Sequence, residues 1–184
     1  MTLDGEVYYW SKHWEFMKFL DLPKLTHERF ELALSSYEKA DQELLESHGW
    51  RVAHALDFSG EMDAYRDYIC SSRGEWTVAK DQNVRLRSGW FSDRAATYLA
   101  AGRPVITQET GFSNVLPTGC GLFAFSTRDE IVSAVGEIRG DYARQSERAI
   151  EIARAYFEAA TVLSKLLTEG GVALPNRGRP EVLS

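Results

Sequence analysis

The 184-residue sequence has only two cysteines and five prolines, and it has no apolar run long enough to cross a bilayer. Cys70 and Cys120 are far apart and form no CxxC pair, so neither a disulfide framework nor a zinc site is indicated. A membrane-spanning helix needs about 18 apolar residues, and the first ten residues lack the basic-then-apolar order of a signal peptide. We therefore expect a cytoplasmic protein with no membrane span and no bound metal.

The sequence also lacks the common catalytic signatures. It contains no Walker A loop, no GxGxxG, no GxSxG and no HExxH. With 44% hydrophobic and 26% charged residues, it has the composition of a globular domain, and 184 residues suffice for one core. The net charge of −6 argues against nucleic acid as a partner.

One stretch carries the opposite charge. The window from Lys80 to Arg103 holds five basic residues and two acidic ones, a local net charge of +3. An acidic protein with one basic window would attract a phosphate-bearing ligand to that window.

Hydrophobic patterns along the chain alternate between strand and helix periods. Short apolar or β-rich runs predict strands at 30–34, 51–56, 75–79, 104–107 and 121–126. Apolar residues at helical spacing separate these runs and continue to residue 167. Alternating strands and helices imply right-handed crossovers, so we predict an α/β fold: a Rossmann-like, doubly wound parallel sheet of about five strands with C-terminal helices. This domain should span residues 26–168, and the Gly- and Pro-rich residues 169–184 should form a flexible tail.

The first 25 residues are unusually aromatic. Trp10, Trp14, Met17 and Leu20 recur at helical spacing, and four further rings lie beside them. This is more apolar surface than a peripheral arm normally exposes to water. Residues 1–25 should therefore either fold back onto the chain's own core or pack against a partner.

Ligands of an open parallel sheet bind beyond the carboxyl ends of the strands. The loops that meet there contain most of the polar candidates for contacting a ligand: Ser35, Ser36, Lys80, Arg85, Arg87, Ser92, Asp93, Arg94, Glu109, Thr110 and Gly111. Each also has an ordinary structural interpretation. The hydroxyls of Ser35 and Ser36 either cap the following helix or contact phosphate.

The remaining candidates are helix-start and charged residues. Ser92 fits the N-cap of a helix whose free N–H groups attract anions. Arginine at 85, 87 or 94 can donate twice to a diphosphate or simply be solvated at the surface. The carboxylate of Asp93 or Glu109 either accepts hydrogen bonds from sugar hydroxyls or caps a helix and pairs with these arginines.

The phrases "YLAAGRPVIT" and "GLFAFSTRDEIVSAV" resemble the C-terminal, donor-binding half of GT-B glycosyltransferases, and "SGWFSDR" and "QETGF" are similar to phrases of uncharacterised bacterial members. The resemblance runs from about Phe30 to Leu167. It implies a domain that binds a nucleoside diphosphate sugar as donor substrate, with no tightly bound cofactor. The leaving diphosphate would be stabilised by arginine and helix-end amides rather than by a metal.

The sequence departs from this family in two ways. Many retaining members have two Glu residues where this chain has Gly89 and Thr97. A complete GT-B enzyme also has an acceptor-binding domain, for which 184 residues leave no room. We therefore expect residues 1–25 and 159–168 to contact a second copy in a homodimer, or a partner domain.

Two other functions fit the same pattern of strands and helices. One is a non-catalytic interaction or regulatory module that keeps the Rossmann-like core for assembly. The other is a phospho-receiver domain, which is disfavoured because "SSYEK" follows the first strand where a receiver needs an acidic pair.

Overall fold

The computed structural model describes residues 2–172 and shows an α/β protein in which helices alternate with short strands. The strands are β1 (Thr2–Leu3), β2 (Glu6–Val7), β3 (Glu31–Leu34), β4 (Arg51–His54), β5 (Glu75–Thr77), β6 (Val105–Gln108) and β7 (Leu122–Phe125). The helices are α1 (His13–Met17), α2 (Leu22–Thr26), α3 (Lys39–Ser47), α4 (Leu56–Ser59), α5 (Met62–Ser71), α6 (Asp81–Arg85), α7 (Asp93–Ala100), α8 (Arg128–Gly140), α9 (Tyr142–Phe157) and α10 (Ala159–Glu169), with a 3-10 turn η1 (Phe112–Asn114). Most of the predicted tail, residues 173–184, lies outside the described residues.

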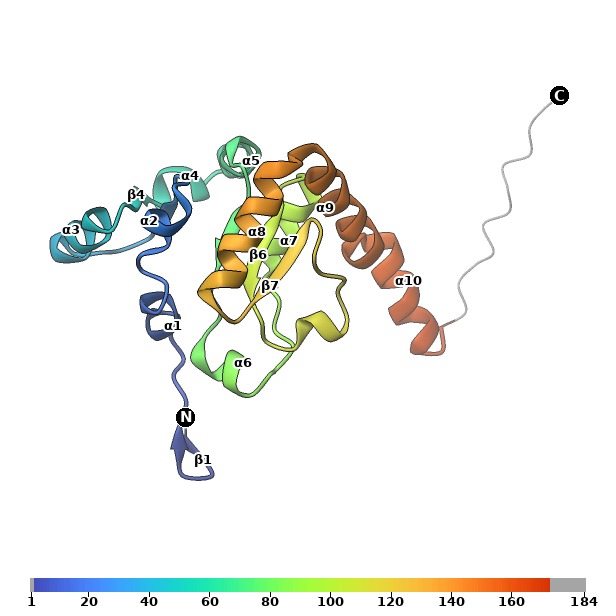
Figure 1. The fold of residues 1–184 in the computed structure, drawn as a ribbon. Coiled ribbons are helices and arrows are strands. Elements are labelled where there is room, and N and C mark those ends of the chain that lie inside the picture. The colour runs from blue at the N-terminus through green and yellow to red at the C-terminus, as the bar shows by residue number, and fades with distance from the viewer. Residues whose placement is uncertain (1, 173–184) are drawn as a thin grey trace.

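A three-stranded parallel sheet in the order β5-β6-β7 forms the centre of the molecule (Figure 1). All four residues of β6 are buried, as expected for a parallel strand that is covered on both faces. Pro104 directly precedes β6, where its missing N–H removes no ladder bond, and its carbonyl accepts a hydrogen bond of 3.0 Å from the Glu75 amide.

The other two predicted strands form a separate parallel pair. β3 pairs with β4, with Leu32 opposite Val52. All five predicted strands are thus present, but they form sheets of two and three strands rather than one sheet of about five. Bulky rings lie between the two sheets: Trp76 of β5 contacts Phe30 and Trp50, with ring centroids 6.4 and 5.5 Å apart. Paired strands of one sheet lie about 4.8 Å apart, and β3 does not pair with β5.

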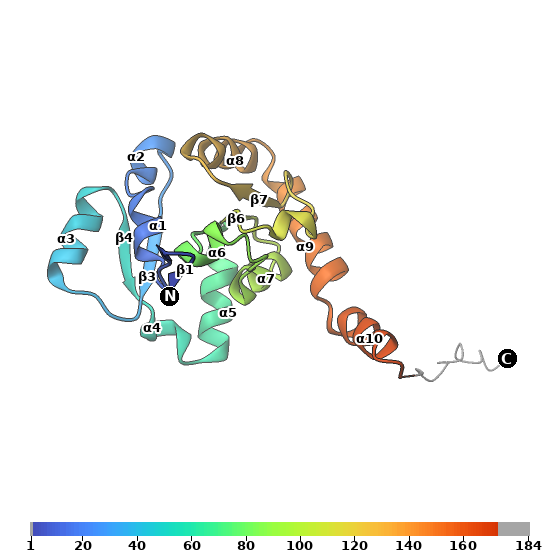
Figure 2. The same ribbon diagram turned by 90° about the horizontal axis from the view of Figure 1, so that it is seen from below.

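Two apolar clusters cover the two faces of the central sheet. On one face α7 and α9 pack through Leu99 and Ile152, which are almost completely buried. On the other face α8 packs through Ile131, and Phe19 and Leu22 from the N-terminal region join the same cluster. Figure 2 shows α1, α2, β3, β4 and α3 together on one side of the molecule, and α7 and α9 on the other.

Part of the N-terminal region folds back onto the chain's own core, and part of it stays exposed. Phe19 and Leu22 are buried in the core, and the indole of Trp50 donates a hydrogen bond of 2.7 Å to the Leu20 carbonyl. Trp10 and Trp14 remain 71% and 54% exposed. Residues 18–26 therefore dock on the chain's own core, whereas the two tryptophans stay at the surface.

The last described helix, α10, extends away from the body of the molecule (Figure 1). None of its residues is buried, and its four large apolar side chains are between 39% and 63% exposed: Val162, Leu163, Leu166 and Leu167. Within residues 2–172, no helix combines the length and apolar character needed to cross a bilayer.

Candidate functional site

A polar cluster lies where β5 ends and α7 begins. The hydroxyl of Thr77, the last residue of β5, accepts hydrogen bonds of 3.1 Å from both Lys12 Nζ and Arg94 Nη2. Arg94 is in the first turn of α7, so the helix presents its amino-terminal end to the same place. Free N–H groups there favour an anion.

Arg94 forms an ion pair with the buried side chain of Glu75. Arg94 Nε donates a hydrogen bond of 2.5 Å to Glu75 Oε1, and the Glu75 side chain is only 5% exposed. Burial alone would lower the pKa of Arg94, but the adjacent carboxylate outweighs it and raises the pKa above its ordinary value. The ion pair holds the guanidinium beside Thr77, and the Arg94 side chain remains 44% exposed.

Lys12 brings a second cation to this point. The pKa of Lys12 is lowered to about 8, chiefly by burial and then by repulsion from Arg94. Glu75 opposes this shift, and Lys80 adds a smaller repulsion in the same direction as Arg94. Among the described residues Lys12 has no carboxylate within 4.0 Å, although its ammonium lies 5.1 Å from the Trp90 ring centroid. Lys12, Lys80 and Arg94 thus make an excess of positive charge that a bound anion would neutralise.

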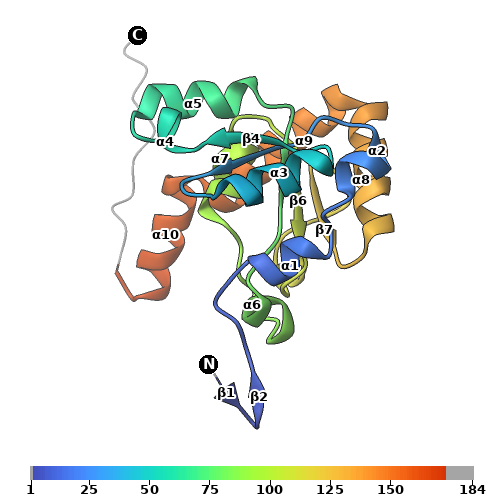
Figure 3. The same ribbon diagram turned by 90° about the vertical axis from the view of Figure 1, so that its left-hand side faces the viewer.

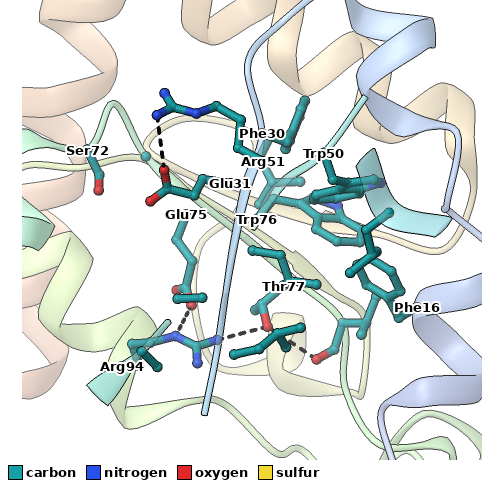
Figure 4. A pocket seen from close by; sticks show the side chains of 18 of the residues that line it. Phe16, Phe30, Glu31, Trp50, Arg51, Ser72, Glu75, Trp76, Thr77 and Arg94 are labelled. Carbon is teal, nitrogen blue, oxygen red and sulfur yellow. Dashed lines mark hydrogen bonds and ion pairs between the residues drawn. The ribbon is translucent and has the colours of Figure 1, made fainter. Parts of the chain in front are cut away.

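A cavity of about 1090 Å³ opens beside the cluster, between the edges of β3 and β5. Figure 4 shows its two kinds of wall: a polar side with Glu75, Thr77 and Arg94, and an aromatic side with Phe16, Phe30 and Trp50. Two of its buried polar atoms, Glu75 Oε2 and Trp76 Nε1, have no hydrogen-bond partner among the described residues. A ligand with both a donor and an acceptor would satisfy them.

A buried polar network holds Lys12 in place. Within α1, Glu15 is 2% exposed and accepts a hydrogen bond of 2.6 Å from Gln108 Nε2, at the carboxyl end of β6. Gln108 Oε1 in turn accepts a hydrogen bond of 3.0 Å from the Ala79 amide, just after β5. This network ties α1 to the carboxyl ends of both strands, and so it places Lys12 at the site.

The predicted contacts separate into groups. Arg94 is at the centre of the cluster, and Ser92 is the N-cap of α7 as predicted, although its side chain makes no capping hydrogen bond. Asp93, the first residue of α7, accepts a hydrogen bond of 2.8 Å from the Arg94 amide. Lys80 contributes charge to the cluster.

The serines after β3 do not cap the next helix. The N-cap of α3 is Glu38, whose amide donates a hydrogen bond of 3.1 Å to the Asp41 carboxylate in a capping box. The capping interpretation of Ser35 and Ser36 is therefore wrong, because the N-cap lies two residues after Ser36 and three after Ser35. Ser36 lines the cavity, and Ser35 is exposed.

In the loop after β6, the side chains of Glu109 and Thr110 bond to other parts of the same chain. Thr110 is 0% exposed and donates a hydrogen bond of 2.6 Å to the Trp90 carbonyl, so its hydroxyl is not open to a ligand. Glu109 accepts a hydrogen bond from the Gly111 amide and lies 3.8 Å from Arg87. A ligand would reach these side chains only by displacing such pairs.

The sequence patterns did not identify Lys12, Glu75 and Thr77 as members of the site. Lys12 belongs to a region that looked like a connector, and its place depends on how α1 docks. Glu75 and Thr77 lie inside a strand, and sequence spacing does not reveal that their side chains reach Arg94.

No protein-family model matches this chain, and no curated protein sequence matches it. Within residues 2–172, no group of three or more His, Cys, Asp or Glu side chains is arranged to hold a metal ion.

Proposed function

We propose that this chain is the donor-binding domain of a GT-B type glycosyltransferase and that it binds a nucleoside diphosphate sugar. The observation that carries the proposal is the group of three cations, Lys12, Lys80 and Arg94, at the carboxyl end of β5 and the start of α7. Diphosphates bind at such strand ends in α/β proteins, where helix N–H groups and basic side chains point at the phosphate oxygens.

The topology supports the same proposal. Residues of both β3 and β5 line the cavity, so joining the two separate sheets across it would give the strand order β4-β3-β5-β6-β7. A doubly wound Rossmann-like sheet has this order, and its ligand lies at the point between the first and third strands. Here that point is the cavity with its cation cluster.

Each residue then has a role in holding the donor. Arg94 and Lys12 donate to the diphosphate and stabilise the charge that develops on it as the sugar leaves. Glu75 positions Arg94, and the aromatic side of the cavity offers a face for a flat ring. The acceptor and its base belong to a partner domain, so this chain alone should bind donor and transfer little sugar.

Titration calorimetry with UDP-, dTDP- and GDP-sugars tests the proposal. We expect one of the three to bind, and Lys12→Met to weaken it about tenfold by removing a charge-assisted hydrogen bond. Lys39→Met, which removes an exposed lysine of α3 paired with Glu43, is the matched control and should bind like the wild type. The absence of heat with all three donors would rule the proposal out.

A non-catalytic interaction module is the second candidate, and α10 favours it. Its exposed apolar side chains, Leu163 and Leu166 at 55% and 63%, suit a protein partner better than water. This candidate requires a partner on α10 and no binding of any nucleotide sugar, so the same titration separates the two functions.

A further inference from the structure

A short N-terminal segment, residues 6–10, contacts two cations of the α6 region: Lys80, the N-cap of α6, and Arg85, its last residue. We call this segment the strap. Arg85 Nη1 donates a hydrogen bond of 2.7 Å to the Val7 carbonyl, and its Nη2 pairs with the Glu6 carboxylate. Lys80 Nζ lies 3.5 Å from the centroid of the Trp10 ring. Two of the cations expected to bind a diphosphate are therefore occupied by the chain itself.

The backbone of the strap is also attached to α6. The Tyr9 amide donates a hydrogen bond of 2.9 Å to Asp81 Oδ2, and the Tyr9 carbonyl accepts one of 3.5 Å from the Gln82 amide. Figure 3 shows β2 leading away from α6 toward the N-terminus, at the lower end of the molecule. The strap is thus connected to α6 through polar contacts and through cation–ring contacts, since Arg85 also lies 4.1 Å from the centroid of the Tyr8 ring.

These contacts are weak enough to be exchanged for a ligand. Glu6 is 62% exposed and Arg85 is 36% exposed, and an ion pair at such positions contributes about 1 kcal/mol at most. Trp10 is 71% exposed, so little apolar area holds it. Segments with few buried contacts open at low free-energy cost.

We infer that the strap is a built-in competitor for the anion site, with the Glu6 carboxylate standing where a phosphate of the ligand would pair with Arg85. A diphosphate would gain Lys80 and Arg85 only after the strap has left them. Lys12 lies just after the strap and is held separately through Thr77, so release of the strap would not remove it from the site. The identity of the ligand rests on the proposed donor function, whereas the competition itself concerns any diphosphate.

The test compares the full chain with Glu6→Gln at constant ionic strength, using inorganic pyrophosphate and the three nucleotide sugars as probes in calorimetry. We expect Glu6→Gln to bind pyrophosphate about two- to fivefold more tightly than the wild type, the gain that loss of an exposed ion pair allows. Glu43→Gln removes an equally exposed carboxylate on α3 and should leave the affinity unchanged. In an Arg85→Met background, Glu6→Gln should have no effect.

Hydrogen exchange gives a second readout. Saturating pyrophosphate should speed exchange of the Tyr9 and Gln82 amides, because both bonds belong to the docked strap. Slower exchange at Tyr9, or weaker binding in Glu6→Gln, would show that the strap is part of the binding site and would overturn the inference.

The outcomes for the strap and for the donor function differ. Equal pyrophosphate affinity in wild type and Glu6→Gln overturns the inference, while binding of a nucleotide sugar by both would still support the donor function. Pyrophosphate binding with the expected gain, but no binding of any nucleotide sugar, supports the strap and rules out the donor function. No binding of any anion to either protein overturns both.

Discussion

The ammonium group of Lys12 donates a hydrogen bond of 3.1 Å to the hydroxyl of Thr77, 65 residues further along the chain. This contact connects the N-terminal region to the carboxyl end of β5, where Arg94 bonds to the same hydroxyl. Two cations sharing one neutral acceptor repel each other, and an anionic ligand would relieve that repulsion. This pair of cations leads to predictions about stability and about the pH dependence of stability and binding.

The first prediction concerns the ion pair of Arg94 with Glu75. Arg94→Met should lower the free energy of unfolding by about 2–4 kcal/mol, because it leaves a buried carboxylate without its partner. Urea denaturation followed by circular dichroism measures the loss. Arg148→Met removes an exposed pair with Glu151 and should cost less than about 1 kcal/mol. Equal losses of unfolding free energy in the two variants would contradict the claim that burial of Glu75 makes its ion pair important for stability.

The second prediction concerns the pKa of Lys12. The unfolded chain binds this proton up to about pH 10.4, whereas the folded chain releases it at about pH 8. Between these values the unfolded state holds more protons, so the Lys12 contribution to the free energy of unfolding rises with pH and is complete above pH 10.4. Below pH 8 both states are protonated, and the contribution stays at its minimum. The difference between wild type and Lys12→Met, measured by urea denaturation from pH 7 to 10, should show this rise.

Ligand binding should have the opposite dependence on pH. A phosphate-bearing ligand favours the charged form of Lys12, so affinity for pyrophosphate should fall as the pH rises through about 8. Calorimetric titrations at pH 7, 8 and 9 measure this fall, and it should be absent in Lys12→Met. An identical fall in that variant would assign it to another group.

The third prediction concerns the close approach of two loops. Gly111 has φ of 98°, and a Cβ there would lie 2.9 Å from the Arg87 carbonyl oxygen. Gly111→Ala should therefore cost about 1–3 kcal/mol of unfolding free energy in thermal or urea denaturation. Gly136→Ala, in the middle of α8 with open space at its Cβ, should stabilise the protein by up to about 1 kcal/mol. Equal effects of the two substitutions would contradict this argument.

The fourth prediction concerns assembly. We expect the exposed apolar stripe of α10 to be buried in a homodimer, and sedimentation at tens of micromolar measures the mass. Leu163→Glu with Leu166→Glu should then give a monomer, because charges on that stripe would be desolvated in the interface. Lys165→Glu, which changes an exposed charge on the same helix, should leave the dimer intact. A monomeric wild type would contradict the prediction.

Local features of the site could be predicted from the sequence. The alternation of apolar runs and helical stripes predicted all five strands, and Ser92 was predicted at the start of the helix that proves to be α7. The position of Arg94 beside a helix start follows from the same local signals. By contrast, capping by Ser35 or Ser36, one of the two roles considered for them, is wrong, since Glu38 is the N-cap of that helix in a capping box with Asp41.

The sequence alone determined the elements and their order, because strand and helix periods, caps and glycine turns depend on residues a few positions apart. Only the tertiary structure decided that the strands divide into two sheets, because strand pairing joins residues that lie far apart in the sequence. It also decided that Lys12 joins Arg94 at Thr77, since α1 reaches the strand ends through a buried network of Glu15 and Gln108. Contacts between side chains many residues apart depend on packing, which no local pattern encodes.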